Sequence, residues 1–574
     1  MVSSKVHTQR RTLRQYLLLR HGPTRWALFL VAAVLGFTLI RLLWLDTILT
    51  IDEAIPGYIG MQWLHGLPPY ANSLDNKGPL CYGIYLVSTK LFGSTIMPLR
   101  LFSDSLFALS LLAVFRIGQM WFGARAAVLA LLLYGFAANV PILEGPLAVP
   151  DSLSMPFLVL SFYFCVCHMN LSGQDSLKNP FFAGLFLAVA LLIHPVRVLG
   201  IIPLAYALLY RFVGLRREKR NLPHPSARLA SHAAAAGLGI GLPSAAMFLE
   251  LYREGVLDDL LRVCRGAGPS YLAMNTDVPL GHYFMTVVQG LPIWVAASIG
   301  VLILLGRLDY RAGFIFAALV PPLFLICGLP PRYGHKFQAI LPMAAIAGGL
   351  ALDHLISLYS RRRPRNYVKA LLRTTALSGL IGIVLLSVIP SVWLQAKHYP
   401  NYNIHWRFVD WDWAFFRSSE QQRAVASYLK EHAPRGDPIL LHGAFMDIYW
   451  LSGRGAPSVY VSTYRYPGVV IPDDEYNKLV EGVNAGEFAY VGFLDWPPDE
   501  VIDAVRSRYS LETAFGDSRY HFLLYSRRTL SDPLVRNCPA LRIEEFGTGQ
   551  QLPRPRPPYL IDIKESKGVQ TCAS

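Results

Sequence analysis

Ionisable side chains that could act on a substrate gather in a few short segments of this chain, each beside an apolar run. The most suggestive is the acidic pair Asp52-Glu53, which follows the first of these runs. A carboxylate at such a place can serve as a general base that takes the proton of a hydroxyl group. Basic side chains suited to hold a phosphate group occur in the same segment and in later ones. They are Lys77, Arg100, His194, Arg197, Arg332, His335 and Lys336.

A further acidic residue, Asp151, begins a later apolar run. Carboxylates together with a phosphate are ligands that suit Mg²⁺ or Mn²⁺, so Asp52 and Asp151 are the candidate ligands of a divalent cation. Each residue also has an ordinary explanation when taken alone. Acids after an apolar run are often solvated, as Glu144 could be, and Lys77 or Arg100 could anchor lipid headgroups. Only their clustering favours a catalytic site.

The elements that must position these residues are membrane-spanning helices. The 574 residues are 53% hydrophobic and 16% charged, with a mean hydropathy of +0.35, whereas soluble domains are about 25% charged. This composition excludes a disordered chain, and seven cysteines over this length exclude a small disulfide scaffold. A helix needs about 20 apolar residues to cross the bilayer core. Eleven spans are predicted, near residues 27–45, 101–121, 125–143, 152–169, 180–195, 197–213, 229–249, 283–305, 312–328, 337–355 and 374–394.

The orientation of these spans follows from one short segment. Residues 78–93 are apolar but only 16 residues long and contain Lys90, so they are predicted to lie in the membrane interface. With a cytoplasmic N-terminus, the inner segments then hold 23 Lys and Arg, against ten in the rest of residues 1–394. This is the positive-inside bias. The net charge of +15 therefore reflects orientation and gives no support to nucleic-acid binding. All the candidate site residues fall on the outer face.

The composition changes after residue 394. Residues 395–574 contain 20 basic and 22 acidic residues, and an odd number of spans places them outside the membrane. Helices are predicted at 419–432, 473–485 and 498–508, and strands at 438–441, 458–462, 488–494 and 520–526. The chain thus divides into a transmembrane catalytic domain, 1–394, and a small soluble α/β domain, 395–574. In an oxidising compartment Cys538 and Cys572 could pair or could remain free thiols.

Several motifs of the first outer loop resemble those of a known family. In order they are Asp52-Glu53, Gly66-Leu67-Pro68-Pro69-Tyr70, Asp75-Asn76-Lys77-Gly78-Pro79 and Leu99-Arg100-Leu101. This order resembles the C-type (GT-C) membrane glycosyltransferases, in the bacterial branch related to protein O-mannosyltransferases and to the aminoarabinose transferases of lipid A. Asp151 and the stretch Arg332-Tyr333-Gly334-His335 extend the resemblance, which covers most of residues 27–394.

The resemblance implies an enzyme of the bacterial inner membrane. Such an enzyme transfers a glycosyl group, with inversion, from a polyprenyl-phosphate-linked sugar to a lipid, polysaccharide or protein of the cell envelope, at the extracytoplasmic face. It implies that Asp52 is the base or orients the acceptor, that Glu53 and Asp151 support it, and that the basic residues named above bind the donor phosphate.

Two departures from the lipid A enzymes leave donor and acceptor open. A single Pro follows Gly78 where those enzymes have a pair, and His194-Pro195 stands where they have a Lys. Two other interpretations compete with an enzyme. One is a transporter or flippase of lipid-linked saccharides without chemistry, and the other is an inactive scaffold.

Overall fold

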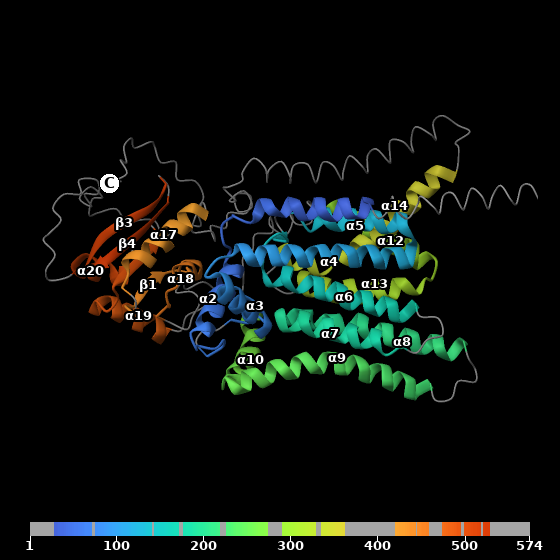
Figure 1. Cartoon of the computed structure of the whole chain (residues 1–574), viewed down its shortest axis with the longest axis horizontal. Helices are drawn as coiled ribbons and strands as arrows, with labels where there is room; N and C mark the ends of the chain where they lie inside the picture. Colours follow the sequence, from blue (N-terminus) through green and yellow to red (C-terminus); the bar gives the residue numbers. More distant parts are fainter. Residues whose placement is uncertain are drawn as a thin grey trace, which may run out of the picture.

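The computed structural model describes residues 28–71, 75–140, 143–170, 176–218, 225–273, 290–328, 334–361, 419–434, 436–443, 445–457, 473–494, 499–517 and 520–528. In these residues a bundle of long helices is followed, at one end only, by short helices and then by a small α/β domain (Figure 1). The predicted division near residue 394 lies between α14 of the bundle and α17 of the α/β domain, outside the described residues.

The bundle is built from apolar helices that run roughly side by side. They are Leu28–Trp44, α4 (Met97–Phe122), α5 (Ala124–Ala137), α6 (Pro150–Asn170), α7 (Lys178–Ile193), α8 (Ile201–Glu218), α9 (Pro225–Arg253), α12 (Leu291–Gly306), α13 (Tyr310–Gly328) and α14 (Leu341–Arg361). Six candidate spans are long and apolar enough to cross a membrane, and four further helices are apolar but shorter. Ten of the eleven predicted spans fall on these helices, and the eleventh, 374–394, lies outside the described residues.

The bundle packs closely where small residues face a neighbouring backbone. A Cβ atom on Gly300 of α12 would lie 1.9 Å from the carbonyl oxygen of Ala347 on α14, and one on Gly184 of α7 would lie 2.2 Å from that of Ala236 on α9. Such contacts are how helices associate in a bilayer, where apolar burial between helices contributes little. The outer surface stays apolar, with exposed leucines such as Leu109 of α4. These features suit a bundle surrounded by lipid.

Three short helices lie at one end of the bundle: α2 (Ile51–Leu64), α3 (Pro79–Phe92) and α10 (Leu257–Ala273) (Figure 1). The 14 residues of α3 are too few to cross about 30 Å of hydrocarbon, as predicted for the segment 78–93. The η3 turn (Pro195–Gly200) separates α7 from α8, so residues 180–213 form two helices rather than one. The helix α10 was not predicted.

The α/β domain has a four-stranded mixed sheet. Its elements are α17 (Ser419–His432), β1 (Ile439–His442), α18 (Met446–Ser452), α19 (Asp473–Ala485), β2 (Tyr490–Leu494), α20 (Asp499–Arg508), β3 (Tyr509–Asp517) and β4 (Tyr520–Arg527). The strand order is β1-β2-β4-β3, with β1 parallel to β2 and the other pairs antiparallel. The three predicted helices and three of the four predicted strands are present, while α18 and β3 were not predicted. The strand predicted at 458–462, Cys538 and Cys572 lie outside the described residues.

Candidate functional site

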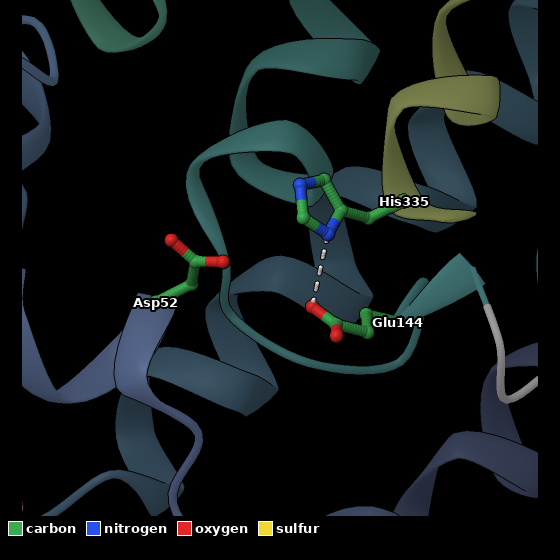
Figure 2. A group of neighbouring side chains, drawn as sticks. All are labelled: Asp52, Glu144 and His335. Carbon is green, nitrogen blue, oxygen red and sulfur yellow. Dashed lines mark ion pairs between the residues drawn. The ribbon is translucent and has the colours of Figure 1, made fainter. Parts of the chain in front are cut away.

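Three ionisable side chains from separate segments meet at the end of the bundle next to α2. Asp52 stands in the first turn of α2, Glu144 in the loop before α6, and His335 in the η4 turn (Gly334–Ala339). Figure 2 shows the two carboxylates and the imidazole converging. One ligand atom from each lies within 4.8 Å of the others. We call these three residues the acid–histidine cluster.

The Asp52 carboxylate pairs with a lysine across the cluster. Its Oδ1 atom lies 3.2 Å from Nζ of Lys77, and the Asp52 side chain remains 26% exposed. The backbone holds Lys77 in place on the end of α7. The Gly78 N–H donates to the carbonyl of Ile193 at 3.1 Å, and a Cβ atom on Gly78 would lie 2.0 Å from the Leu192 carbonyl oxygen, so only glycine fits there.

Asp151 lies beside the cluster and is held by basic groups. Its Oδ1 accepts from Nη2 of Arg197 at 2.6 Å, and its Oδ2 lies 3.4 Å from Nε2 of His194 and 3.8 Å from Nε2 of His335. Arg197 also donates through Nε to Ser154 and is almost fully buried. The sequence predicted Asp52 and Asp151 as metal ligands, but the group close enough to share an ion pairs Asp52 with Glu144 and His335 instead. The oxygens of Asp151 are already engaged by Arg197 and His194.

The charges of the cluster influence one another strongly. Burial would lower the pKa of His335, but Glu144, Asp151 and Asp52 outweigh it and raise that pKa. Burial would raise the pKa of Asp52, but Lys77 and His335 together lower it, so the carboxylate is ionised. Burial lowers the pKa of Lys336 to about 8 despite the attraction of Asp151. Asp151 and Asp52 both act on the charge of Lys336, which therefore belongs to the same electrostatic site.

Glu144 is the participant that the sequence did not single out. Its backbone lies in the left-handed region, at φ 53°, which is unusual for a residue other than glycine. Oε2 of Glu144 lies 3.5 Å from Nδ1 of His335. The buried Arg41 side chain holds this loop by donating to the carbonyl oxygens of Ala138 and Gly145. Strain of this kind persists where the surrounding structure enforces it, often at functional sites.

Glu53 and Arg100 lie in a different environment from Asp52. Both side chains are fully buried, and they form a two-point ion pair with Nε–Oε1 at 2.9 Å and Nη2–Oε2 at 2.6 Å. Glu53 also accepts from the Ala148 N–H at 2.8 Å. Arg100 donates in addition to the carbonyls of Trp44, Thr47 and Ile48, between 2.7 and 3.0 Å. The structure therefore places both residues inside the protein, apart from the acid–histidine cluster, whose Asp52 remains partly exposed.

The predicted site residues thus divide into three groups. The structure brings Asp52, Lys77, Asp151, His194, Arg197, His335 and Lys336 together at one place. It buries Glu53 and Arg100 as a pair. Arg332 lies outside the described residues.

Comparison with known proteins connects this site to one fold. The sequence family described as dolichyl-phosphate-mannose-protein mannosyltransferase matches residues 76–236, a stretch that includes Lys77, Asp151 and Arg197. No curated protein sequence matches the chain.

Three solved structures resemble the chain over most of its length. ArnT from Cupriavidus metallidurans, bound to undecaprenyl phosphate, is similar with a TM-score of 0.60 and 15% identity, over 87% of this chain and 98% of ArnT. The oligosaccharyltransferase of Archaeoglobus fulgidus, tethered to an acceptor peptide, is similar with a TM-score of 0.51 and 13% identity, over 88% of this chain and 75% of its own. The arabinofuranosyltransferase AftD from Mycobacteria is similar with a TM-score of 0.51 and 13% identity, over 87% of this chain and 41% of AftD.

At these identities the structural likeness concerns the fold. The family match adds a sequence signature over the stretch that contains the Lys77 loop and the start of α6. Together they confirm the resemblance on which the sequence analysis relied. The chain is therefore similar in sequence to the dolichyl-phosphate-mannose-protein mannosyltransferase family over residues 76–236, and it shares the fold of ArnT and of the archaeal oligosaccharyltransferase over most of its length.

Proposed function

We propose that this protein transfers a glycosyl group from a polyprenyl-phosphate-linked donor to a cell-envelope acceptor, with inversion at the anomeric carbon. One observation carries the proposal: the partly exposed carboxylate of Asp52 lies 3.2 Å from the ammonium group of Lys77. A base beside a cation can take the proton of an acceptor hydroxyl while the cation stabilises the charge of the leaving phosphate. Two similar structures support the donor class, since ArnT is bound to undecaprenyl phosphate and the Archaeoglobus fulgidus oligosaccharyltransferase is found in complex with a dolichol-phosphate.

The step is a single displacement. The acceptor oxygen attacks the anomeric carbon while Asp52 takes its proton, and the bond from that carbon to the phosphate oxygen breaks. The polyprenyl phosphate leaves with the bonding electron pair, and Lys77 and Lys336 stabilise its charge. Because phosphate is a good leaving group, positioning the reactants and holding charge supply most of the catalysis. One backside displacement inverts the anomeric configuration.

The acid–histidine cluster also fits a divalent cation. Asp52 and Glu144 would each supply a carboxylate oxygen and His335 a ring nitrogen, a mixed set that suits Mn²⁺ or Zn²⁺ better than Mg²⁺. A bound cation would neutralise phosphate charge. The chain's own residues would then orient the donor, with Lys77 and Lys336 on its phosphate. His335 must be neutral to bind a metal, so its ion pair with Glu144 is the competing state.

The orientation proposed is a cytoplasmic N-terminus with the site and the α/β domain on the extracytoplasmic face of the bacterial inner membrane. The helix α2, which carries Asp52, lies at the same end of the bundle as the α/β domain (Figure 1). The helices α8 and α14 both start at that end, and each leads at its other end toward one of the two most basic runs, 216–220 and 361–365. Such runs mark the cytoplasmic side.

Transfer by the purified protein tests the proposal. In detergent no gradient exists, so a transporter or flippase would leave a labelled polyprenyl-phosphate sugar unchanged. The enzyme is expected to move the label onto an envelope fraction taken from a strain that lacks the protein. If a panel of hexosyl and pentosyl donors gives no transfer, while the protein moves lipid-linked sugars across liposomes, the enzyme proposal is wrong.

Replacing Lys77 by Ala is expected to raise the apparent KM for the lipid-linked donor by about 10- to 100-fold. The estimate follows from a charge-assisted hydrogen bond worth roughly 1.5–3 kcal/mol. Initial rates at varied donor concentration measure it. Lys90→Ala is the matched control, because Lys90 lies on the exposed side of α3. An unchanged KM for Lys77→Ala would assign Lys77 to lipid headgroups instead.

A further inference from the structure

The α/β domain contacts the segment that leads into the helix bearing Asp52. This segment, residues 44–50, ends at Thr50, which caps α2 together with Glu53. On the bundle side Arg100 holds it through the carbonyls of Trp44, Thr47 and Ile48. On the other side, α17 of the α/β domain contacts this segment through Gln422, and α18 packs against α2 (Figure 1). The start of α2 is therefore held from two directions.

The contact on the domain side is made by one buried glutamine. Gln422 of α17 accepts from the Leu49 N–H through Oε1 at 3.0 Å and donates from Nε2 toward the Leu49 carbonyl at 3.4 Å. Its side chain thus pairs with both polar groups of the Leu49 backbone, as a neighbouring strand would. Leu49 directly follows Ile48, which Arg100 holds. The two buried contacts fix successive residues, three and four positions before Asp52.

A second buried residue sets the direction of the Gln422 amide. Asp447, at the start of α18, accepts a hydrogen bond from Nε2 of Gln422. Burial raises the pKa of Asp447 to about 7, and in its ionised form this carboxylate can only accept hydrogen bonds, so it selects the amide nitrogen and leaves Oε1 for the Leu49 N–H. Both Gln422 and Asp447 are nearly fully buried, at 2% and 6% exposure. A flipped amide would face the Leu49 N–H with a second donor, and buried donors without acceptors are costly.

The same domain face packs on α2 itself. A Cβ atom on Gly57 would lie 2.5 Å from the Trp450 ring, so α2 and α18 are in direct contact there. The Trp450 indole donates to Thr89 of α3 at 3.3 Å, and the Ala456 N–H donates to the Tyr58 hydroxyl at 2.8 Å. These contacts hold the body of α2, while Gln422 holds its start.

We propose that the α/β domain positions the catalytic carboxylate, and that Gln422 is the positioning residue through which it does so. The inference rests on the proposed role of Asp52. Gln422 touches neither donor nor acceptor. It acts by fixing Leu49, hence the cap of α2 and the direction of Asp52 toward Lys77, which is itself held separately by the end of α7. Misplacing a catalytic group by about 1 Å can lower a rate on the order of 100-fold.

Steady-state kinetics of the full-length Gln422→Ala variant test the proposal. The kcat is expected to fall on the order of 10- to 100-fold, with the donor KM within about threefold of wild type because the Lys77 loop is untouched. Arg423→Ala is the matched control. Arg423 lies next in the same helix and pairs with Asp46 of the same segment, but both side chains are about half exposed, so its loss should change kcat less than twofold. A Gln422→Ala kcat equal to that of the control would overturn the proposal.

An exchange of the two side chains tests the hydrogen-bond pattern itself. Gln422→Glu alone places a carboxylate against Asp447 and should lower kcat as Gln422→Ala does. Adding Asp447→Asn supplies a donor at 447 for one oxygen of the carboxylate introduced at 422 and leaves the other oxygen to accept from the Leu49 N–H, so the double variant should recover most of the loss. A double variant no more active than Gln422→Glu would remove the Gln422–Asp447 pair from the proposal.

Hydrogen–deuterium exchange separates this inference from the proposed function. In Gln422→Ala, amides 47–55 should exchange at least about tenfold faster, while those of 76–93 should not change. This readout stands even if the wild-type protein transfers no sugar, which would defeat the proposed function alone. Unchanged exchange at 47–55 would overturn the inference whatever the activity.

Discussion

Replacing Asp52 by Asn is expected to lower kcat for glycosyl transfer by about 100- to 10,000-fold, the usual contribution of a general base. Asparagine keeps the shape of the side chain but cannot take the proton of the acceptor hydroxyl. It also removes the charge opposite Lys77 and one anionic oxygen from the acid–histidine cluster. Because Asp52 remains partly exposed and its neighbour Glu53 supplies the buried ion pair, the fold should survive. Initial rates with saturating donor, together with a thermal midpoint in detergent, measure both expectations.

Asp46→Asn is the matched control for this variant. Asp46 lies in the same loop but pairs at the surface with Arg423, a kind of contact worth about 0–1 kcal/mol. Its kcat should stay within about twofold of wild type, and both variants should unfold at the wild-type temperature. Near-normal turnover by Asp52→Asn would remove Asp52 from the mechanism and leave Glu144 and Asp151 as the acids to examine.

The helices of the bundle could be predicted because hydrophobic length alone requires them. The short segment 78–93 was assigned to the interface by the same argument, and α3 has the expected extent. The helices α17 and α19 begin and end at the residues predicted for them from the sequence, where apolar residues recur with the spacing of a helix. The failures are elements without a local signal. The strand β3 follows α20 with no intervening turn residue, and α18 is seven residues long and forms where it packs on α2.

The site could be predicted as a set of residue types but not as an arrangement. Asp52 and Glu53 are neighbours in sequence, yet about 100° of helix rotation sends one toward Lys77 and the other into the protein toward Arg100. One signal for Glu53 was present in the sequence, since it stands three residues after Thr50 in the spacing of a capping box. In a capping box the glutamate side chain accepts a hydrogen bond from the backbone, which argues for a structural role and against a catalytic one.

Arg100 and Glu144 show what depends on tertiary structure. An arginine at the start of an apolar span needs a buried partner, but the sequence does not say whether that partner is a phosphate or a carboxylate. Glu144 resembled a solvated loop acid until its loop, held by Arg41, was seen to direct it toward His335. The partner of Arg100 and the direction of Glu144 both depend on contacts between residues more than 40 positions apart.

Replacing Arg100 by Met is expected to destabilise the protein by about 3–5 kcal/mol, the usual cost of removing one partner of a buried ion pair. The Glu53 carboxylate would stay buried and lose its bidentate partner, and the carbonyls of Trp44, Thr47 and Ile48 would lose their donor. Methionine fills similar space, so the effect reports charge and hydrogen bonding rather than a cavity. The measurement is the thermal midpoint of purified protein in detergent, with the yield of monodisperse protein as support.

The double variant Arg100→Met/Glu53→Gln separates a structural role from a phosphate-binding one. Glu53→Gln removes the unpaired buried charge, so it should recover part of the decrease in thermal midpoint caused by Arg100→Met. A buried neutral amide costs less than a buried unpaired carboxylate. If Arg100 instead binds the carrier phosphate, Arg100→Met should leave the midpoint unchanged and raise the donor KM, as Lys77→Ala is expected to do. The structure favours the first outcome, since a guanidinium that is fully buried against Glu53 and three carbonyls has its donors directed into the protein.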